Sequence, residues 1–391
     1  LLSALFTISA ALDPEVNLNA PGIIKHWGYP AETHYATTED GYILALHRIP
    51  YGRNESSGGC RPVIFLQHGI MCDSTAWIVN IPEKSAGFVF ADAGFDVWIG
   101  NMRGNTYSTN HTTLSPLSEA FWNFSWDEMA RYDLDAMIGK ALNVSGQDQL
   151  YYAAHSQGTI TMFAKLSYDP TFASKINKFF GLAPIAAFIN IQGLLKFIGD
   201  YFNGVFYALY DIIGPIDFLP DSFFTHLYAS IVCPGPFGDE VCSELYFLIG
   251  GPQTAQYNMS RTPVYTAHYP AGTSSKNIKH FMQLMHVNGT VYRYNYDTPE
   301  ANVQHYGTPV PPSYDLSTIA TDMYLFTGVE DYLADAYDVT DYLLAWLNPA
   351  YVKQLTNLTG FNHFDFIWGT QAAEDIYTPI AEIIKKDQLQ C

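Results

Sequence analysis

The stretch AAHSQGT at residues 153–159 places Ser156 between small and polar residues and follows it two positions later with Gly158. The preceding residues, QDQLYY, run into apolar and aromatic positions that predict a short buried strand, and TITMFAKLSY after the serine has the apolar spacing of a helix. A serine at a strand-to-helix junction is the context of the G-x-S-x-G nucleophile elbow. The alternative interpretation is an ordinary helix N-cap, for which serine is a preferred residue.

The stretch departs from the elbow consensus at one position, because Ala154 stands where the first glycine usually does. Small residues are needed on both sides of the serine, since the turn brings the strand and helix backbones close together. Alanine adds a single methyl group, and Gly158 is retained. The pattern therefore still favours an elbow.

The composition is that of a large globular chain. Its 391 residues are 48% hydrophobic and 15% aromatic, which is enough for a sizeable core and for one domain with an insertion, or two domains. The 38 acidic residues outnumber the 19 basic ones, giving a net charge of −19. This excess argues against a nucleic-acid partner and against electrostatic adsorption to anionic lipid. Beyond the first residues, no apolar run has the length of a transmembrane segment.

The amino-terminal residues and the glycosylation motifs both indicate the secretory route. Residues 1–12 resemble the apolar core of a signal peptide that ends in small residues. Seven N-x-S/T sequons are present, which fits a secreted or lumenal protein. They begin at Asn54, Asn110, Asn123, Asn143, Asn258, Asn288 and Asn357.

Five cysteines are present, at positions 60, 72, 233, 242 and 391. In an oxidising compartment Cys233 and Cys242 can close a small loop across PGPFGDEV, whereas no C-x-x-C or histidine-rich pairing indicates a zinc site. The odd total leaves at least one cysteine without a partner in the chain.

Strand-like runs alternate with helical ones along much of the chain. RPVIFLQHG, FDVWIGN, QLYYAAHS, INKFFGLAPI and DMYLFTGVE are short, apolar and closed by turn residues, the pattern of a mostly parallel sheet covered by helices. Between about residues 186 and 313 this rhythm gives way to aromatic, Gly-rich and Pro-rich sequence with helical periodicity. We expect an α/β fold, with a core at 13–185 and 314–391 and an inserted, largely helical cap at 186–313.

A nucleophilic serine needs an imidazole to accept its proton and a carboxylate to hold that ring in the right tautomer. In the elbow architecture these partners follow the serine in the order acid, then histidine. Of the twelve histidines only His363 lies beyond the last predicted strand. The sequence TGFNHFDFIWG places it in a turn-rich loop before the C-terminal helix, so we predict that His363 is the base.

The acid is expected just after the carboxyl end of a strand. In DMYLFTGVEDYLADAYDV, Asp331 lies nearest to that end and is our choice. Asp335 has the alternative role of an acid in the first turn of a helix, where it favours the helix dipole. Asp365, two residues after His363, has the alternative role of a structural acid in the loop. The sequence leaves both open as alternative catalytic acids.

Acyl transfer also needs amide N–H groups aimed at the developing oxyanion. One is expected from Gln157, directly after the nucleophile, and the other from the loop FLQHGIMCDSTAW, where Ile70 follows His68 and Gly69. His68 precedes Ser156 in the chain, which counts against its being the base and favours a role in anchoring the loop.

Several ordered blocks resemble the acid lipase family of animals, which includes the gastric and lysosomal acid lipases. The blocks include WGYPAETHYATTEDGYILALHRIPYG, LQHGI, ADAGFDVWIGNMRGNTYS, FWNFSWDEMARYDL, HSQGT, PAGTSS, DYLADAYDV and NHFDFIWG, and the resemblance runs from DPEVNLN to the C-terminal helix. It assigns the serine to Ser156, the acid to Asp331, the histidine to His363 and the oxyanion amides to Ile70 and Gln157.

The resemblance implies an α/β-hydrolase core with a cap, part of which, at about 221–250, acts as a lid. It implies hydrolysis of ester bonds in neutral lipids, triacylglycerols or cholesteryl esters, at an oil–water or lipoprotein interface, by a secreted or lysosomal enzyme that needs no metal or organic cofactor. The family's cap disulfide matches Cys233 and Cys242. The alternatives are a catalytically reduced, lipid-binding homologue and an esterase for smaller acyl esters.

Overall fold

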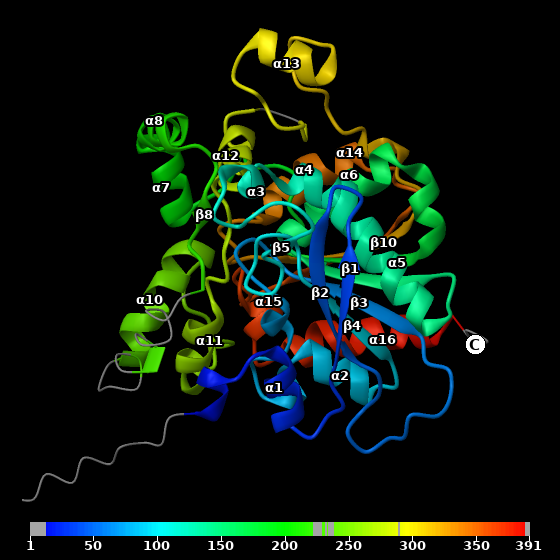
Figure 1. Ribbon diagram of the computed structural model, residues 1–391. Coiled ribbons are helices and arrows are strands. Elements are labelled where there is room, and N and C mark those ends of the chain that lie inside the picture. Colours follow the sequence, from blue (N-terminus) through cyan, green and yellow to red (C-terminus); the bar gives the residue numbers. More distant parts are fainter. Residues whose placement is uncertain (1–12, 222–228, 231–232, 234–237, 288–289, 388–391) are drawn as a thin grey trace, which may run out of the picture.

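The computed structural model describes residues 13–221, 229–230, 233, 238–287 and 290–387 (Figure 1). The predicted signal segment, the sequon at Asn288, Cys391 and much of the first half of the predicted lid lie outside these residues. Among the described residues, no helix is both long enough and apolar enough to cross a membrane.

The centre of the molecule is a mixed sheet in which parallel strands predominate. The strand order is β1-β2-β4-β3-β6-β7-β10-β11, in which the pairs β1–β2 and β2–β4 are antiparallel and every later pair is parallel. The short β5 pairs with β2. The strands span β1 Glu32–Thr37, β2 Tyr42–Ile49, β3 Val63–Gln67, β4 Asp96–Gly100, β5 Asn110–His111, β6 Leu150–His155, β7 Ile176–Leu182, β10 Asp322–Gly328 and β11 Val352–Leu358.

Each of the five apolar runs singled out in the sequence contains a strand of this sheet, namely β3, β4, β6, β7 and β10. The three strands β3, β4 and β6 are buried along their whole length. Such continuous burial is expected of parallel strands that are covered by helices on both faces. The α/β prediction is confirmed.

Helices cover the sheet on both sides. In Figure 1, α2 and α16 lie together on one side, and α5, α6 and α14 lie on the other. The helices of this part of the chain are α1 Ala20–His26, α2 Ala86–Asp92, α3 Glu119–Trp122, α4 Trp126–Glu128, α5 Leu134–Ser145, α6 Gln157–Tyr168, α14 Leu344–Trp346, α15 Asp365–Trp368 and α16 Thr378–Lys385.

A largely helical insertion separates β7 from β10 and lies along one flank of the sheet and above it (Figure 1). The first part of the insertion, whose sequence has helical periodicity, forms two helices, α7 and α8, interrupted at Phe202. The described elements of the insertion are α7 Gly193–Tyr201, α8 Asn203–Ile213, β8 Asp217–Phe218, α10 Gly238–Gly250, α11 Thr262–His268, β9 Thr273–Ser274, α12 Ser275–Leu284 and α13 Pro299–Tyr306.

The cysteines fall into three environments. Cys233 and Cys242 are joined by a disulfide that links the segment before α10 to the first half of that helix, and the predicted pair is confirmed. Cys60 is disulfide-bonded. Cys72 is a free, buried thiol whose pKa is raised by burial. An oxidised pair within the insertion fits a protein that folds in an oxidising compartment.

Candidate active site

Ser156 stands at the turn between β6 and α6 with φ 54° and ψ −121°, a conformation that a residue other than glycine adopts only under strain. The turn is held by the Ser156 N–H, which donates to the Leu182 carbonyl at 3.1 Å, and by the Thr159 hydroxyl, which donates to the Ser156 carbonyl at 2.6 Å. The Ser156 side chain makes no capping bond to the described part of α6. Ser156 therefore lies at the N-cap position of α6 without capping the helix through its side chain, and the strand–turn–helix arrangement is present.

The small residues around the serine allow a close backbone approach. A Cβ atom on Gly158 would lie 2.8 Å from the Gln67 carbonyl oxygen, so only glycine fits there. Ala154 lies wholly buried in β6, and its neighbour on β7 is Gly181. Side chains of neighbouring strands share a face of the sheet, so the missing side chain at Gly181 leaves room for the alanine methyl. The departure from the elbow consensus is thus accommodated.

Ser156, His363 and Asp331 meet above the carboxyl ends of the parallel strands. The Ser156 Oγ lies 2.9 Å from His363 Nε2, and His363 Nδ1 lies 2.9 and 3.0 Å from the two oxygens of Asp331. All three side chains are buried. The hydroxyl, imidazole and carboxylate thus form a continuous hydrogen-bonded chain, the arrangement required to activate a serine nucleophile.

The loops that carry Asp331 and His363 are also held by backbone hydrogen bonds that do not involve the Ser156–His363–Asp331 contacts. Asp331 Oδ1 accepts the N–H groups of Leu333 and Ala334, both at 2.8 Å. The His363 N–H donates to the Gly250 carbonyl at the end of α10 at 2.9 Å. The insertion therefore helps to hold the loop between β11 and α15 on which His363 lies.

The two alternative acids are engaged elsewhere. Asp335 accepts hydrogen bonds from the Gln192 side chain at 2.9 Å and from the Tyr337 N–H at 2.8 Å. Asp365 accepts from the Thr254 hydroxyl at 2.7 Å and the Asn362 N–H at 2.8 Å, and burial raises its pKa to about 7. Neither carboxylate has a described hydrogen bond to His363, so the structure favours Asp331.

His155 is a part of this site that the sequence analysis did not identify. It lies directly before Ser156, and its Nε2 lies 2.8 Å from the His363 carbonyl oxygen, to which it donates. Burial, together with the nearby His363, lowers the pKa of His155 well below its usual value. A neutral His155 therefore ties the elbow to the loop of His363. Its position beside the nucleophile is the only signal that the sequence carries.

The amides predicted for the oxyanion lie on two loops that pack against each other. A Cβ atom on Gly69 would come within 3.0 Å of Ser156 Cβ, which places the loop of Ile70 beside the nucleophile. In the described part of the chain, neither the Ile70 N–H nor the Gln157 N–H donates to another protein group. Two amides without a described protein partner, on loops that meet at Ser156, suit the stabilisation of a developing oxyanion.

His68 anchors the Ile70 loop, in line with its interpretation from the sequence. The Met102 N–H donates to His68 Nε2 at 3.1 Å, so the ring proton resides on Nδ1 and is donated to the Gly69 carbonyl at 2.8 Å. Burial lowers the pKa of His68 to about 4. A neutral ring with both nitrogens engaged has no proton-transfer role.

The sequons differ in their environments. The side chains at Asn54, Asn110, Asn123, Asn143 and Asn357 are exposed. Asn258 is half-buried, and its amide nitrogen donates to the Asn80 side chain at 3.3 Å. Asn288 lies outside the described residues. Five of the sequons are thus open to an attached glycan.

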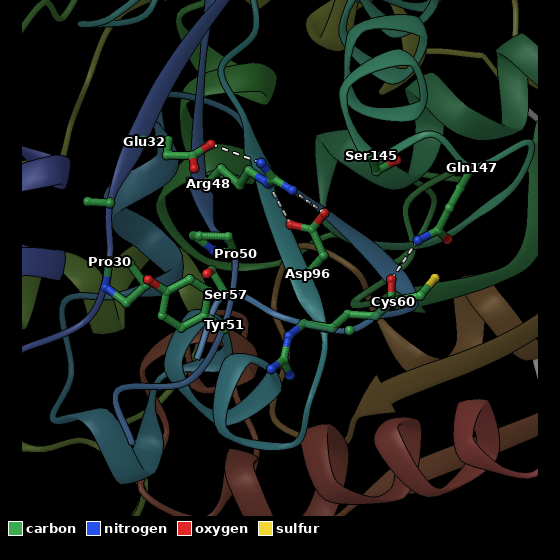
Figure 2. A pocket seen from close by; sticks show the side chains of 13 residues that line it. Pro30, Glu32, Arg48, Pro50, Tyr51, Ser57, Cys60, Asp96, Ser145 and Gln147 are labelled. Carbon is green, nitrogen blue, oxygen red and sulfur yellow. Dashed lines mark hydrogen bonds and ion pairs between the residues drawn. The ribbon is translucent and has the colours of Figure 1, made fainter. Parts of the chain in front are cut away.

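A polar cavity of about 570 Å³ lies at the opposite end of the sheet (Figure 2). It is lined by residues at the start of β3 and β4, whereas Ser156 follows the carboxyl end of β6. Arg48 reaches into it from β2 and bonds Asp96 and Glu32, at 2.8 and 2.9 Å, as Figure 2 shows. This cavity is not part of the serine site.

Two family models match the chain. The model described as a partial alpha/beta-hydrolase lipase region matches residues 20–81, and that of the alpha/beta hydrolase fold matches residues 62–211. The monoglyceride lipase of Saccharomyces cerevisiae, solved with a substrate analogue, superposes with a TM-score of 0.55 at 12% identity, covering 92% of this chain and 96% of that one. At this identity, the likeness concerns the fold alone.

Whole-length relatives are much more similar in sequence. The chain is 50% identical over 381 residues to the lipase lipl-1 of Caenorhabditis elegans, covering 96% of this chain and 94% of that protein. It is 41% identical over 379 residues to the lysosomal acid lipase/cholesteryl ester hydrolase of Homo sapiens, covering 97% and 93%. It is also 41% identical over 384 residues to the gastric triacylglycerol lipase of Bos taurus, covering 97% and 94%.

Proposed function

Because the chain belongs to the acid lipase family of α/β-hydrolases, we propose that Ser156, His363 and Asp331 are the residues through which it hydrolyses lipid esters. The enzyme is a serine carboxylic ester hydrolase of the lipase type. The observation that carries the assignment of residues is the 2.9 Å contact between Ser156 Oγ and a His363 ring whose other nitrogen faces a carboxylate.

The chemistry proceeds in two halves. His363 Nδ1–H donates to Asp331, which leaves Nε2 free to take the Ser156 proton while Oγ attacks the ester carbonyl carbon. The N–H groups of Ile70 and Gln157 stabilise the oxyanion of the tetrahedral intermediate. His363 then gives its proton to the departing alcohol, and a water molecule, activated in the same way, releases the fatty acid from Ser156.

Substitution of the nucleophile tests this assignment. We expect Ser156→Ala to lower ester turnover by at least about 10³-fold, since the acyl-enzyme cannot form. Ser85→Ala is a matched control, because Ser85 is equally buried but donates to the Asn80 carbonyl at 2.8 Å. Both variants are to be compared by thermal denaturation, turnover and labelling with a fluorophosphonate. Full turnover in folded Ser156→Ala would contradict the assignment.

The insertion at 186–313 is proposed to be a cap, with a lid at about 221–250, that meets the lipid surface. Its helices α7 and α8 expose many apolar side chains, an unusual amount for a surface that stays in water. The exposed residues are Phe197, Ile198, Tyr201, Phe202, Val205, Leu209, Ile212 and Ile213. An uncharged oil or lipoprotein surface fits such a face better than an anionic membrane does, since the chain carries a net charge of −19.

Charged substitutions test the docking of this face. We expect Val205→Asp combined with Ile212→Asp to reduce hydrolysis of emulsified triacylglycerol by about 10-fold or more, because an ionised carboxylate opposes transfer into an apolar phase. Hydrolysis of a soluble short-chain ester should stay within twofold. Leu117→Asp is the control, since Leu117 is 97% exposed but lies in a loop of the core. Equal losses on both substrates would contradict the proposal.

The substrate class is proposed to be long-chain neutral lipid esters, with triacylglycerols and cholesteryl esters both within range. The names of the human and bovine relatives support each of these. A panel of emulsified triacylglycerol, cholesteryl ester and soluble short ester, assayed from pH 4 to 8, measures the preference. Activity on the short ester alone would favour a small-ester esterase.

The disulfide and exposed sequons support a place in the lysosomal lumen or outside the cell.

A further inference from the structure

The segment Ala271–Asn277 of the insertion touches both loops that carry the proposed oxyanion amides. It includes most of the block PAGTSS, to which the mechanism above gives no role. At one end, the Ala271 N–H donates to the Met71 carbonyl at 2.7 Å, one residue beyond Ile70. At the other end, Asn277 Nδ2 donates to the Gln157 side-chain oxygen at 2.6 Å.

Both loops are strained where this segment holds them. Met71 has φ 54°, and Ser156, directly before Gln157, also has φ 54°. Such positive values cost free energy in residues other than glycine and persist only where the surroundings enforce them. The Ala271 carbonyl is itself fixed, because it accepts the Thr106 N–H at 3.0 Å. The segment therefore supports the conformation on which the direction of the two amides depends.

Asn277 is oriented unambiguously. It is wholly buried at the start of α12, and its Oδ1 accepts the Trp126 N–H at 2.8 Å. A backbone N–H can only donate, so the amide nitrogen of Asn277 must face the other way. It lies 2.6 Å from the oxygen of Gln157 and 3.1 Å from the Thr273 hydroxyl. The hydrogen-bonding groups of Asn277 are thus all used in bridging α4, β9 and α6.

The Gln157 side chain depends on this bridge. Gln157 is the first residue of α6 and is buried, and its amide nitrogen contacts only the weak acceptor Met129 Sδ, at 3.4 Å, among the described groups. Without Asn277 the Gln157 oxygen would be a buried acceptor with no partner, a costly state that rearrangement of the side chain relieves. Where this rearrangement shifts the backbone of the first residue of α6, the Gln157 N–H shifts with it.

We propose that Asn277 is a positioning residue for the oxyanion hole, holding the Gln157 N–H in line with the developing charge through the Gln157 side chain. The proposal rests on the proposed serine mechanism and assigns to α12 of the insertion a part in catalysis. Asn277 itself does not touch the substrate. Its removal should therefore weaken binding of the transition state without weakening binding of the ester in the ground state.

Asn302 on α13 provides a matched control. It is also buried, its Oδ1 accepts a backbone N–H, from Tyr296 at 2.9 Å, and its Nδ2 donates to a side-chain oxygen, that of Asn295 at 2.9 Å. It thus makes the same kinds of bonds inside the same insertion, but to no residue of the serine site. Asn277→Ala and Asn302→Ala therefore both remove a buried asparagine and its hydrogen bonds, but only Asn277→Ala removes a bond to the serine site.

Kinetics on a soluble ester separate the two roles. We expect Asn277→Ala to lower kcat by about 10- to 100-fold, less than the loss from deleting an oxyanion donor outright, with KM within about twofold. Affinity for an alkyl boronic acid, which forms a tetrahedral adduct with the serine, should fall by a similar factor. Asn302→Ala should change neither quantity by more than about twofold. Equal kcat values for the two variants, or a loss confined to KM, would overturn the proposal.

The partner residue gives a second, independent test. Gln157→Leu keeps the backbone N–H and leaves the bonds of Asn277 to Trp126 and Thr273 in place, so it tests the bridge even if Asn277→Ala does not fold. We expect a kcat loss like that of Asn277→Ala, and no further loss in the double variant, because both remove one interaction. Full kcat in Gln157→Leu would overturn the proposal. The proposed mechanism itself fails separately, if Ser156→Ala remains active.

Discussion

Replacement of Asp331 by asparagine should invert the hydrogen bond that orients His363. The direction follows from the backbone, because the N–H groups of Leu333 and Ala334 both donate to Asp331 Oδ1 at 2.8 Å. In Asp331→Asn the amide oxygen must stay with these two donors. The amide nitrogen then takes the place of Oδ2, 2.9 Å from His363 Nδ1. An N–H donor there favours the tautomer in which His363 Nδ1 accepts and the ring proton lies on Nε2, since the amide oxygen, 3.0 Å from Nδ1, already accepts two backbone N–H groups.

This tautomer cannot act as a base toward Ser156, because its Nε2–H points at the hydroxyl 2.9 Å away. The wild-type tautomer would turn Nδ1–H toward an N–H group and leave as its acceptor only the amide oxygen, which already serves Leu333 and Ala334. The variant also loses the carboxylate that stabilises the imidazolium. Wrong-tautomer substitutions of this kind lower kcat by about 10⁴-fold in other serine hydrolases. We therefore expect a kcat loss of about 10³- to 10⁴-fold, or about 4–5.5 kcal/mol of activation free energy.

The assay is single-turnover acylation by a soluble p-nitrophenyl ester, with KM and thermal denaturation measured in parallel. KM should change little, since Asp331 lies behind the histidine. Asp335→Asn is the matched control, because Asp335 is also buried and bonds Gln192 and Tyr337 but not His363. A folded Asp331→Asn enzyme with more than a tenth of wild-type kcat, or a larger loss in Asp335→Asn, would refute the reasoning.

Three further predictions concern stability and modification. Gly158→Ala should destabilise the fold by about 1–3 kcal/mol, because the added Cβ would lie 2.8 Å from the Gln67 carbonyl oxygen. Gly139→Ala is the control and should not destabilise the fold, because a Cβ there meets nothing within 4 Å. Urea denaturation measures the stability of both variants. Asp365 has a folded pKa of about 7, so the stability of the wild type relative to Asp365→Asn should fall as the pH rises from about 4 to 7, by up to about 4 kcal/mol. Urea titrations at several pH values measure this difference in stability. A difference that does not change with pH would contradict the prediction. Glycopeptide mapping of the protein from a secretory host should find Asn258 unoccupied, because its amide nitrogen is already hydrogen-bonded, and occupancy there would show that this bond opens.

The parts of the fold that the sequence revealed are those with a continuous local signal. The central strands are apolar throughout because helices cover both of their faces, and the five runs identified all contain strands. The edge strands β1 and β11 are half exposed and rich in polar residues, so neither has such a run. β2 carries Arg48, whose charge is neutralised by Asp96 on the neighbouring strand, 48 positions later. Local periodicity does not reveal that compensation.

The residues of the proposed site also differ in how much local sequence signal they carry. Ser156, Asp331 and His363 were identified because each follows a strand in the order that the elbow architecture requires, and the oxyanion residues because they have fixed offsets from the strand ends. Asn277 contacts Gln157 across 120 positions of sequence, in a segment with no strand pattern of its own. Its role depends on a tertiary contact, and a buried asparagine has no signature that distinguishes it from any other asparagine.

The buried ionisable groups around the site bear on the acidity that the enzyme can withstand. His68 has a folded pKa of about 4, whereas its usual pKa is 6.5, so below pH 6.5 the ring gains a proton when the protein unfolds. The contribution of His68 to stability is therefore lost as the pH falls from 6.5 to about 4. Asp365 and Asp73, with folded pKa values of about 7 and 6, keep their protons in the fold and lose them on unfolding above about 3.8, so the stability that they contribute rises as the pH falls over much the same range. The two effects have opposite signs and similar sizes, about 3–4 kcal/mol for His68 and for Asp365. Buried neutral carboxyls therefore counteract part of the stability that the buried neutral histidines of the elbow and its loops lose as the pH falls.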